Sequence, residues 1–171
     1  MSWYDRWYPD YKLKFRKDLD LTVKFRKLVS EAVTPQYAQD RDAGMDLTAT
    51  SFRVTDTFME FGTGIAVEIP HGHVGLLFPR SSITKLAPGV SLKNSVGVID
   101  SNYRGEILVR FELPYSAEMG GTIPVVGDKV AQLLIIPYPT VHMEEVGELS
   151  DSNRGQGGFG STDKKWFWYL L

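Results

Sequence analysis

The sequence predicts an all-β protein, a jelly-roll-like β-sandwich or barrel of short strands. Three observations favour this class: the apolar runs are short, Gly or Pro separates nearly all of them, and no long amphipathic helical pattern occurs. With 171 residues, 43% of them hydrophobic, the chain can bury one sizeable core, so we expect one β domain.

The individual strands follow from local patterns. Residues 107, 109, 111 and 113 are apolar and alternate with residues 106, 108, 110 and 112, three of which are charged, as in a strand with one buried face. Residues 130–136 form an almost wholly apolar run that ends at Pro137. The predicted strands are residues 61–70, 73–78, 106–113 and 130–136, and any helix within residues 81–86 would be short.

Composition excludes several classes of protein. The formal net charge of −2 gives no basic field for nucleic acid, and the absence of cysteine excludes disulfides and thiolate metal sites. Neither a signal peptide nor an apolar run of membrane-spanning length is visible, so we expect no membrane association. The expected location is cytoplasmic, or the interior of a host cell if the chain is viral.

The most informative stretch is residues 97–107, where an apolar strand enters a turn and leaves as a second strand. The turn carries Asp100 and Tyr103. A carboxylate at a strand end can act as a general base when the turn holds it beside a ligand. Taken alone, the same residues equally suit an ordinary hairpin turn, because Asp and Asn favour turns and Tyr fills cross-strand pockets.

A second informative stretch is the Gly-rich segment at residues 154–162. It fits neither a dinucleotide-binding fingerprint nor a P-loop, because too little chain follows for the required helix and Ser161 stands where a P-loop has lysine. Glycine backbone N–H groups can still approach phosphate oxygens, with Arg154 and the Ser161 and Thr162 hydroxyls as further donors. Phe159 could stack on a base. The alternative is a flexible linker.

The two ends of the chain differ from its centre. Residues 1–20 mix aromatic and charged side chains, which could stack on nucleotides but favour an added arm packed on the body. We therefore divide the chain into an aromatic extension (1–20), a β domain (21–151), and a mobile Gly-rich segment with an apolar tail (152–171).

In order and spacing, five segments together resemble the dUTP pyrophosphatase (dUTPase) family. The resemblance covers roughly residues 20–162 and excludes both ends. Met45 stands where an aromatic residue is common in the family. The segments are residues 43–49, 79–82, 94–107, 127–133 and 154–162.

The resemblance implies a homotrimer of β jelly rolls that splits dUTP into dUMP and pyrophosphate, with Mg²⁺ on the triphosphate and active sites shared between subunits. Asp100 would be the general base for water attack on the α-phosphorus, a role that suits a carboxylate. Tyr103 would lie under the deoxyribose and exclude a 2′-hydroxyl. Asn94, with the backbone of Gly97 and Val98, would read the edge of uracil.

The remaining segments would hold the triphosphate. Arg80, Ser81 and Gln132 would bind the α- and β-phosphates, and Ser82 of the same segment would also bind the substrate. The last segment would close over the nucleotide, with Phe159 on the uracil. Its γ-phosphate ligands would be Arg154, Ser161 and Thr162, with Gly160 beside them.

The metal implied by the resemblance is Mg²⁺, which often binds through substrate phosphates and few carboxylates. Asp46 could reach it through water, although its place after Gly44 also suits a turn that enters a strand. His71 and His73 resemble a chelating pair, but no third ligand accompanies them, so a solvent-facing loop is favoured.

Two other functions stay open. A dCTP deaminase of similar fold needs a glutamate on the strand after the hairpin; our alignment places Arg110 there, with Glu112 nearby. A regulatory protein on the same fold could instead bind a protein partner through its aromatic ends, and an enzyme could do this in addition.

Overall fold

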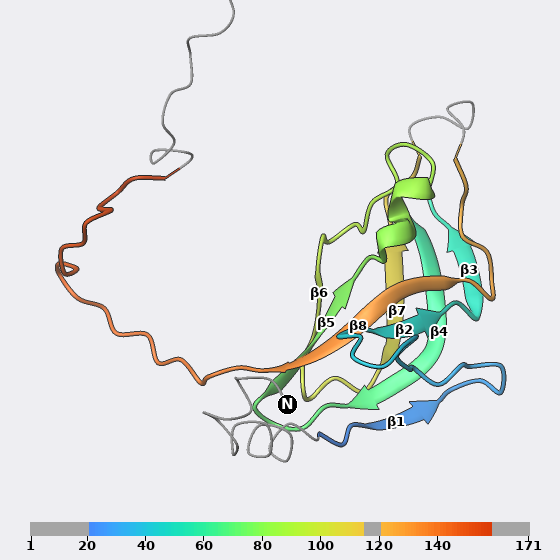
Figure 1. Ribbon diagram of the computed structural model, residues 1–171, viewed down its shortest axis with the longest axis horizontal. Coiled ribbons are helices and arrows are strands. Elements are labelled where there is room, and N and C mark those ends of the chain that lie inside the picture. The colour runs from blue at the N-terminus through green and yellow to red at the C-terminus, as the bar shows by residue number, and fades with distance from the viewer. Residues whose placement is uncertain (1–20, 115–120, 159–171) are drawn as a thin grey trace, which may run out of the picture. The chain divides into compact units, whose positions relative to one another are not determined.

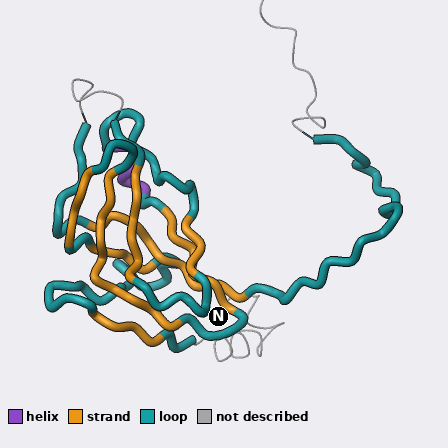
Figure 2. Tube along the Cα trace, turned by 180° about the vertical axis from the view of Figure 1, so that it is seen from behind, coloured by secondary structure: helices purple, strands orange, loops and turns teal. Residues whose placement is uncertain are grey.

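The computed structural model describes residues 21–114 and 121–158. The chain divides into two compact units, Met1–Pro139 and Thr140–Leu171, which are considered separately. Figures 1 and 2 show the strands of the first unit. Its elements are β1 (Lys24–Lys27), β2 (Met45–Thr48), β3 (Ser51–Val54), β4 (Met59–Glu68), β5 (His73–Phe78), the 3₁₀ helix η1 (Ser81–Lys85), β6 (Gly97–Ile99), β7 (Glu106–Phe111) and β8 (Lys129–Pro137).

The strands form two antiparallel four-stranded sheets. In one sheet, β4 pairs with β7 along one edge and with β3 and then β1 along the other. The second sheet has the order β2-β8-β5-β6. The register β5–β6 places Leu77 opposite Gly97 and Gly75 opposite Ile99, which fixes where the following hairpin turn begins.

Both sheets contribute to one hydrophobic core, as a β-sandwich requires. On β7 the residues alternate between buried and accessible, with Ile107, Val109 and Phe111 inside. The rings of Phe61 and Phe111 meet edge to face with centroids 5.9 Å apart. Leu47 and Leu133 bring the second sheet into the same cluster.

The predicted all-β sandwich is therefore confirmed. The four runs predicted as strands are β4, β5, β7 and β8, and the short helix is η1. β4 begins two residues earlier than predicted and ends at Glu68, while β1, β2 and β3 were not predicted as strands because four residues carry too little periodicity. No helix among the described residues is long and apolar enough to cross a membrane.

A bulge in β4 shapes the sheet beside the later hairpin. The β4–β7 register shifts between Gly62 and Ala66, and Gly64 there adopts a φ of +64°, which favours glycine. The Gly64 N–H donates to the Glu106 carboxylate at 2.7 Å, and Thr63 Oγ1 donates to the Ile107 carbonyl at 2.8 Å. These bonds tie the start of β7 to the middle of β4.

Candidate functional site

The predicted hairpin residues line one cavity of about 570 Å³, which we call the hairpin cavity. It lies against the face of β7 that points away from the core. Its lining residues are Thr57, Phe58, Lys93, Asn94, Val98, Ile99, Asp100, Tyr103, Glu106, Leu108 and Arg110.

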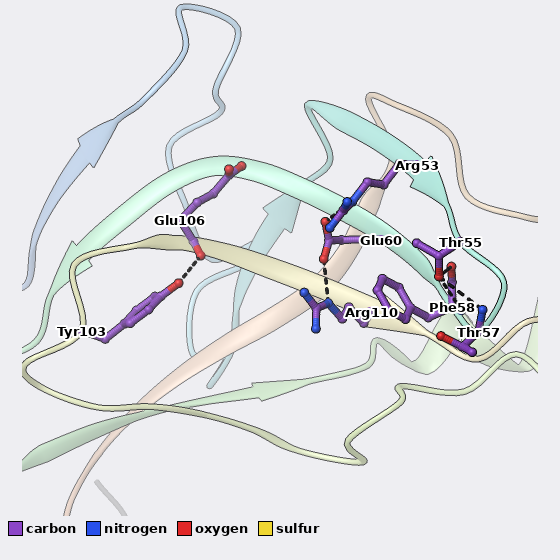
Figure 3. A network of polar contacts seen from close by, with 8 residues as sticks. All are labelled: Arg53, Thr55, Thr57, Phe58, Glu60, Tyr103, Glu106 and Arg110. Carbon is purple, nitrogen blue, oxygen red and sulfur yellow. Dashed lines mark hydrogen bonds and ion pairs between the residues drawn. The ribbon is translucent and has the colours of Figure 1, made fainter.

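The hairpin turn positions Asp100 and Tyr103 through its backbone. The Tyr103 N–H donates to the Asp100 carbonyl at 3.0 Å, and Tyr103 Oη donates to the Glu106 carbonyl at 2.9 Å (Figure 3). A Cβ at position 105 would come within 2.6 Å of Tyr103 Cζ. The tyrosine ring therefore fits here only because Gly105 has no side chain. The Asp100 side chain is exposed at the turn.

Asn94 enters the hairpin cavity from a segment that pairs with the end of β7. Leu92 forms a bridge with Phe111, and the Lys93 N–H donates to the Arg110 carbonyl at 2.9 Å. Lys93 Nζ lies 2.8 Å from a Glu112 carboxylate oxygen. Asn94 therefore lies beside Arg110, at the opposite end of β7 from Tyr103.

The predicted phosphate ligands gather elsewhere, in a cavity of about 660 Å³ that we call the arginine cavity. Arg80 and Ser81 enter it from the start of η1, Asp46 from β2 and Gln132 from β8. The register β2–β8 places Asp46 opposite Gln132. The lining residues are Ala38, Asp42, Ala43, Gly44, Asp46, Phe78, Pro79, Arg80, Ser81, Gln132 and Leu134.

Polar contacts hold this second group in place. Arg80 Nε donates to Asp46 Oδ1 at 2.8 Å. Lys129 Nζ lies 2.7 Å from Asp46 Oδ2 as an ion pair without the alignment of a hydrogen bond. Gln132 Nε2 donates to the Pro79 carbonyl at 3.0 Å, and a side chain at Gly44 would collide with Gln132. The nearly buried Asp46 carboxylate thus contacts two cationic side chains.

The hairpin cavity and the arginine cavity share no lining residue. Ser82 lines a further cavity of about 650 Å³, which Arg80 also borders. Gly97 is buried in β6 against Leu77 and does not itself line the hairpin cavity.

The Gly-rich segment lies in the second unit. Arg154 Nε donates to the Gly157 carbonyl at 2.7 Å, and Gly155 adopts a φ of +52°. The predicted ligands Phe159, Gly160, Ser161 and Thr162 lie outside the described residues.

Sequence analysis missed a charged cluster that borders the hairpin cavity. Glu60 Oε1 accepts from Arg53 Nε and Glu60 Oε2 accepts from Arg110 Nε, both at 2.6 Å (Figure 3). The hydrogen bond from Arg53, followed by that from Arg110, holds the pKa of Glu60 below its usual value. Nothing in the sequence links these residues, because they meet only through the pairing of three strands.

The two histidines line a smaller cavity of about 400 Å³, together with Asp100 and Tyr138. His71 lies in the turn before β5, and His73 begins that strand. Within the described ranges, no group of three or more His, Cys, Asp or Glu side chains could hold a metal ion.

Residues 30–163 match the family model described as dUTPase. The chain is 40% identical over 151 residues to a deoxyuridine 5′-triphosphate nucleotidohydrolase of Clostridium tetani (strain Massachusetts / E88), covering 85% of this chain and 99% of that relative. A protein with the same description from Corynebacterium glutamicum is 40% identical over 147 residues, which cover 83% of this chain and 95% of the relative.

Solved structures similar to this chain are also described as dUTPases. The dUTPase of Staphylococcus bacteriophage 80alpha with dUPNHPP has a TM-score of 0.70 and 26% identity, covering 82% of this chain and 97% of that chain. A point mutant of the dUTPase from phage phi11 of S. aureus, described as coordinating a structural Mg(II) ion, has a TM-score of 0.62 and 26% identity. The match covers 75% of this chain and 98% of that chain.

Proposed function

Because the chain belongs to the dUTPase family, we propose that it hydrolyses the magnesium complex of dUTP to dUMP and pyrophosphate by water attack on the α-phosphorus. One observation carries the assignment to this site: Asn94, Val98, Asp100 and Tyr103 border the same cavity. In this proposal Asn94 and Val98 contact the edge of the base, Tyr103 contacts the deoxyribose and Asp100 activates the attacking water.

Asp100 acts as the general base in this proposal. Its carboxylate accepts a proton from water while the water oxygen bonds to the α-phosphorus and the bond to the bridging oxygen breaks, which releases pyrophosphate. The exposure of Asp100 at the turn supports this role, because water reaches the carboxylate. Tyr103, held by Glu106, packs under the sugar and leaves no space for a 2′-hydroxyl.

Arg80, Ser81 and Gln132 bind the phosphates from the arginine cavity. Mg²⁺ enters as part of the substrate, since triphosphate oxygens and water suffice to hold it and protein carboxylates add little. Contacts with Arg80 and Lys129 support a role for Asp46 in orienting the cations that face the phosphates, and a metal-bound water is its further expected contact.

The separation of the two cavities supports an active site shared between copies of the chain. The hairpin cavity is lined by the proposed general base, Asp100, and by the expected nucleoside contacts, whereas the arginine cavity is lined by the expected phosphate ligands. In a homotrimer, the hairpin cavity of one subunit would face the arginine cavity of the next. A cyclic assembly repeats this contact and completes every site.

The test is to incubate the protein with Mg²⁺ and each of dUTP, dCTP, dTTP and UTP, and to separate the products. We expect dUMP and pyrophosphate from dUTP, with much slower turnover of the other nucleotides. Release of ammonia from dCTP would instead establish a deaminase, and orthophosphate as the first product from dUTP would show attack on a different phosphorus.

A further inference from the structure

Arg110 borders the hairpin cavity and is fixed there by two contacts. Its Nε donates to Glu60 Oε2 at 2.6 Å, and its Cζ lies 4.6 Å from the centroid of the Phe58 ring. A guanidinium held by a carboxylate and an aromatic face loses most of its freedom to turn. Arg110 is therefore oriented before any ligand binds.

The supports of Arg110 are themselves fixed. Only 7% of the Glu60 side chain is exposed, and Arg53 holds its other oxygen at 2.6 Å. Phe58 ends a tight turn in which the Thr55 N–H and hydroxyl both donate to the Phe58 carbonyl, at 2.9 and 3.1 Å. Figure 3 shows the Arg110 guanidinium beneath the Glu60 carboxylate, with the Phe58 ring at its side.

The position of Arg110 along β7 indicates which part of a nucleotide it meets. Glu106, next to Tyr103, and Arg110 lie on the same face of β7, and four residues of a strand span roughly 13 Å. If Tyr103 packs on the sugar and Asp100 lies at the α-phosphate, the base occupies the other end of the cavity. Asn94 and Arg110 border that end.

The chemistry at that end differs between these two residues. The Asn94 amide carries both a donor and an acceptor and can turn to satisfy either uracil or cytosine. The guanidinium has only donors, and Glu60 takes the one on Nε. Lys93 also has only donors, but its Nζ pairs with Glu112 at 2.8 Å.

We propose that Arg110 is a specificity-determining residue, which donates a hydrogen bond to the O4 carbonyl of uracil and disfavours the 4-amino group of cytosine. Two donors facing each other leave both unpaired. Once the bound base shields the half-exposed Arg110 from water, such a mismatch costs more affinity than a missing apolar contact. The inference rests on the proposed function for the identity of the occupant and for its orientation, with the sugar at Tyr103 and the α-phosphate at Asp100.

The experiment compares Arg110→Met with Arg53→Met in the full-length chain. Both arginines bond Glu60 at 2.6 Å, but only Arg110 borders the cavity, so Arg53→Met controls for the loss of the ion pair. Binding of the non-hydrolysable α,β-imido analogues of dUTP and dCTP is measured by calorimetry, beside kcat/KM for dUTP and dCTP. The preference for uracil over cytosine should fall about 10- to 100-fold in Arg110→Met and change far less in Arg53→Met, in which Glu60 Oε2 still contacts Arg110.

An unchanged uracil preference in a folded Arg110→Met protein would overturn the inference, as would an equal loss in Arg53→Met. The binding measurement separates this failure from that of the proposed function. A wild-type protein that binds the uracil analogue preferentially through Arg110, yet leaves dUTP intact, would support the inference and refute the activity. A protein that hydrolyses dUTP with a uracil preference that does not depend on Arg110 would support the proposed activity and refute the inference.

Discussion

At the scale of single residues, Asp100 is placed by the backbone of its turn. Its carbonyl accepts the Tyr103 N–H at 3.0 Å, while its side chain lies exposed between the hairpin cavity and the cavity of the two histidines. A carboxylate positioned in this way can change to an amide without disturbing the fold. Its chemistry can therefore be tested apart from its structure.

Asp100→Asn should lower kcat for dUTP by roughly 10²–10⁴-fold, because the amide cannot accept the proton of the attacking water. Binding of α,β-imido-dUTP should persist, since the substitution removes a negative charge near the phosphates. Steady-state kinetics and calorimetry measure both effects. Asp56→Asn, an exposed aspartate in the β3–β4 turn, serves as the control. Retention of more than about a tenth of the wild-type kcat would show that Asp100 only forms the turn.

At the scale of elements, β4 organises its sheet, and Glu60, the second residue of this strand, joins β3 to β7. The register places Glu60 opposite Arg53 on one side and Arg110 on the other. Because these contacts lower the pKa of Glu60, the ionised form stabilises the fold above the unfolded-state pKa. This contribution is lost as the pH falls through the folded-state pKa.

Glu60→Gln should lower the free energy of unfolding at pH 7 by about 1–2 kcal/mol, the scale of a charged hydrogen bond whose arginine partners stay partly solvated. The difference in unfolding free energy between variant and wild type should shrink as the pH falls below 4.5, the usual pKa of a glutamate. Urea unfolding at fixed protein concentration over a pH series measures this. Glu68→Gln, which breaks the exposed ion pair with Lys24, should have a smaller effect. A pH-independent difference would contradict the assigned role of the Glu60 charge.

At the scale of the whole molecule, the two cavities of the first unit divide the expected active site. Asp100 and the nucleoside contacts belong to one set of lining residues, and Arg80 and the phosphate contacts belong to the other. The site shared between two copies that we propose would account for this division.

Mixing Asp100→Asn with Arg80→Ala subunits should therefore restore activity that each variant lacks alone. In a cyclic trimer with sites between neighbours, each mixed trimer has one intact site, so random equal mixing should give about a quarter of the wild-type rate. Co-expression with two affinity tags and light scattering would measure activity and assembly. Full activity in a monomer, or no recovery in verified mixed trimers, would contradict a shared site.

The C-terminal segment offers a second test at this scale. Ordering each residue of a glycine-rich chain costs roughly 1–2 kcal/mol of backbone entropy, so we expect residues 152–162 to close only on a bound triphosphate. Truncation after Asp151 should remove most activity without unfolding the β domain. Truncation after Thr162 removes the apolar tail, which we expect to pack on the trimer and hold the far end of the Gly-rich segment. This truncation should chiefly raise KM, because closure over the triphosphate then lacks that anchor. A fully active 1–151 fragment would exclude closure, whereas a fully active 1–162 fragment would exclude only the anchor.

The sequence by itself determined the features that depend on neighbouring residues. Alternation over residues 106–113 identified β7, and Pro137 marked the end of β8. The order of five short segments indicated the family, which the match over residues 30–163 confirms. Asp100 and Tyr103 could be paired in advance because a single turn carries both.

Only the tertiary structure decided which distant side chains meet. Glu60 contacts Arg110 because β4 pairs with β7, and Asp46 contacts Arg80 and Lys129 where β2, β8 and the start of η1 converge. The separation of the hairpin and arginine cavities has the same origin. Strand partners and register are set by burial of a shared core over long sequence separations, and no local pattern of residues encodes them.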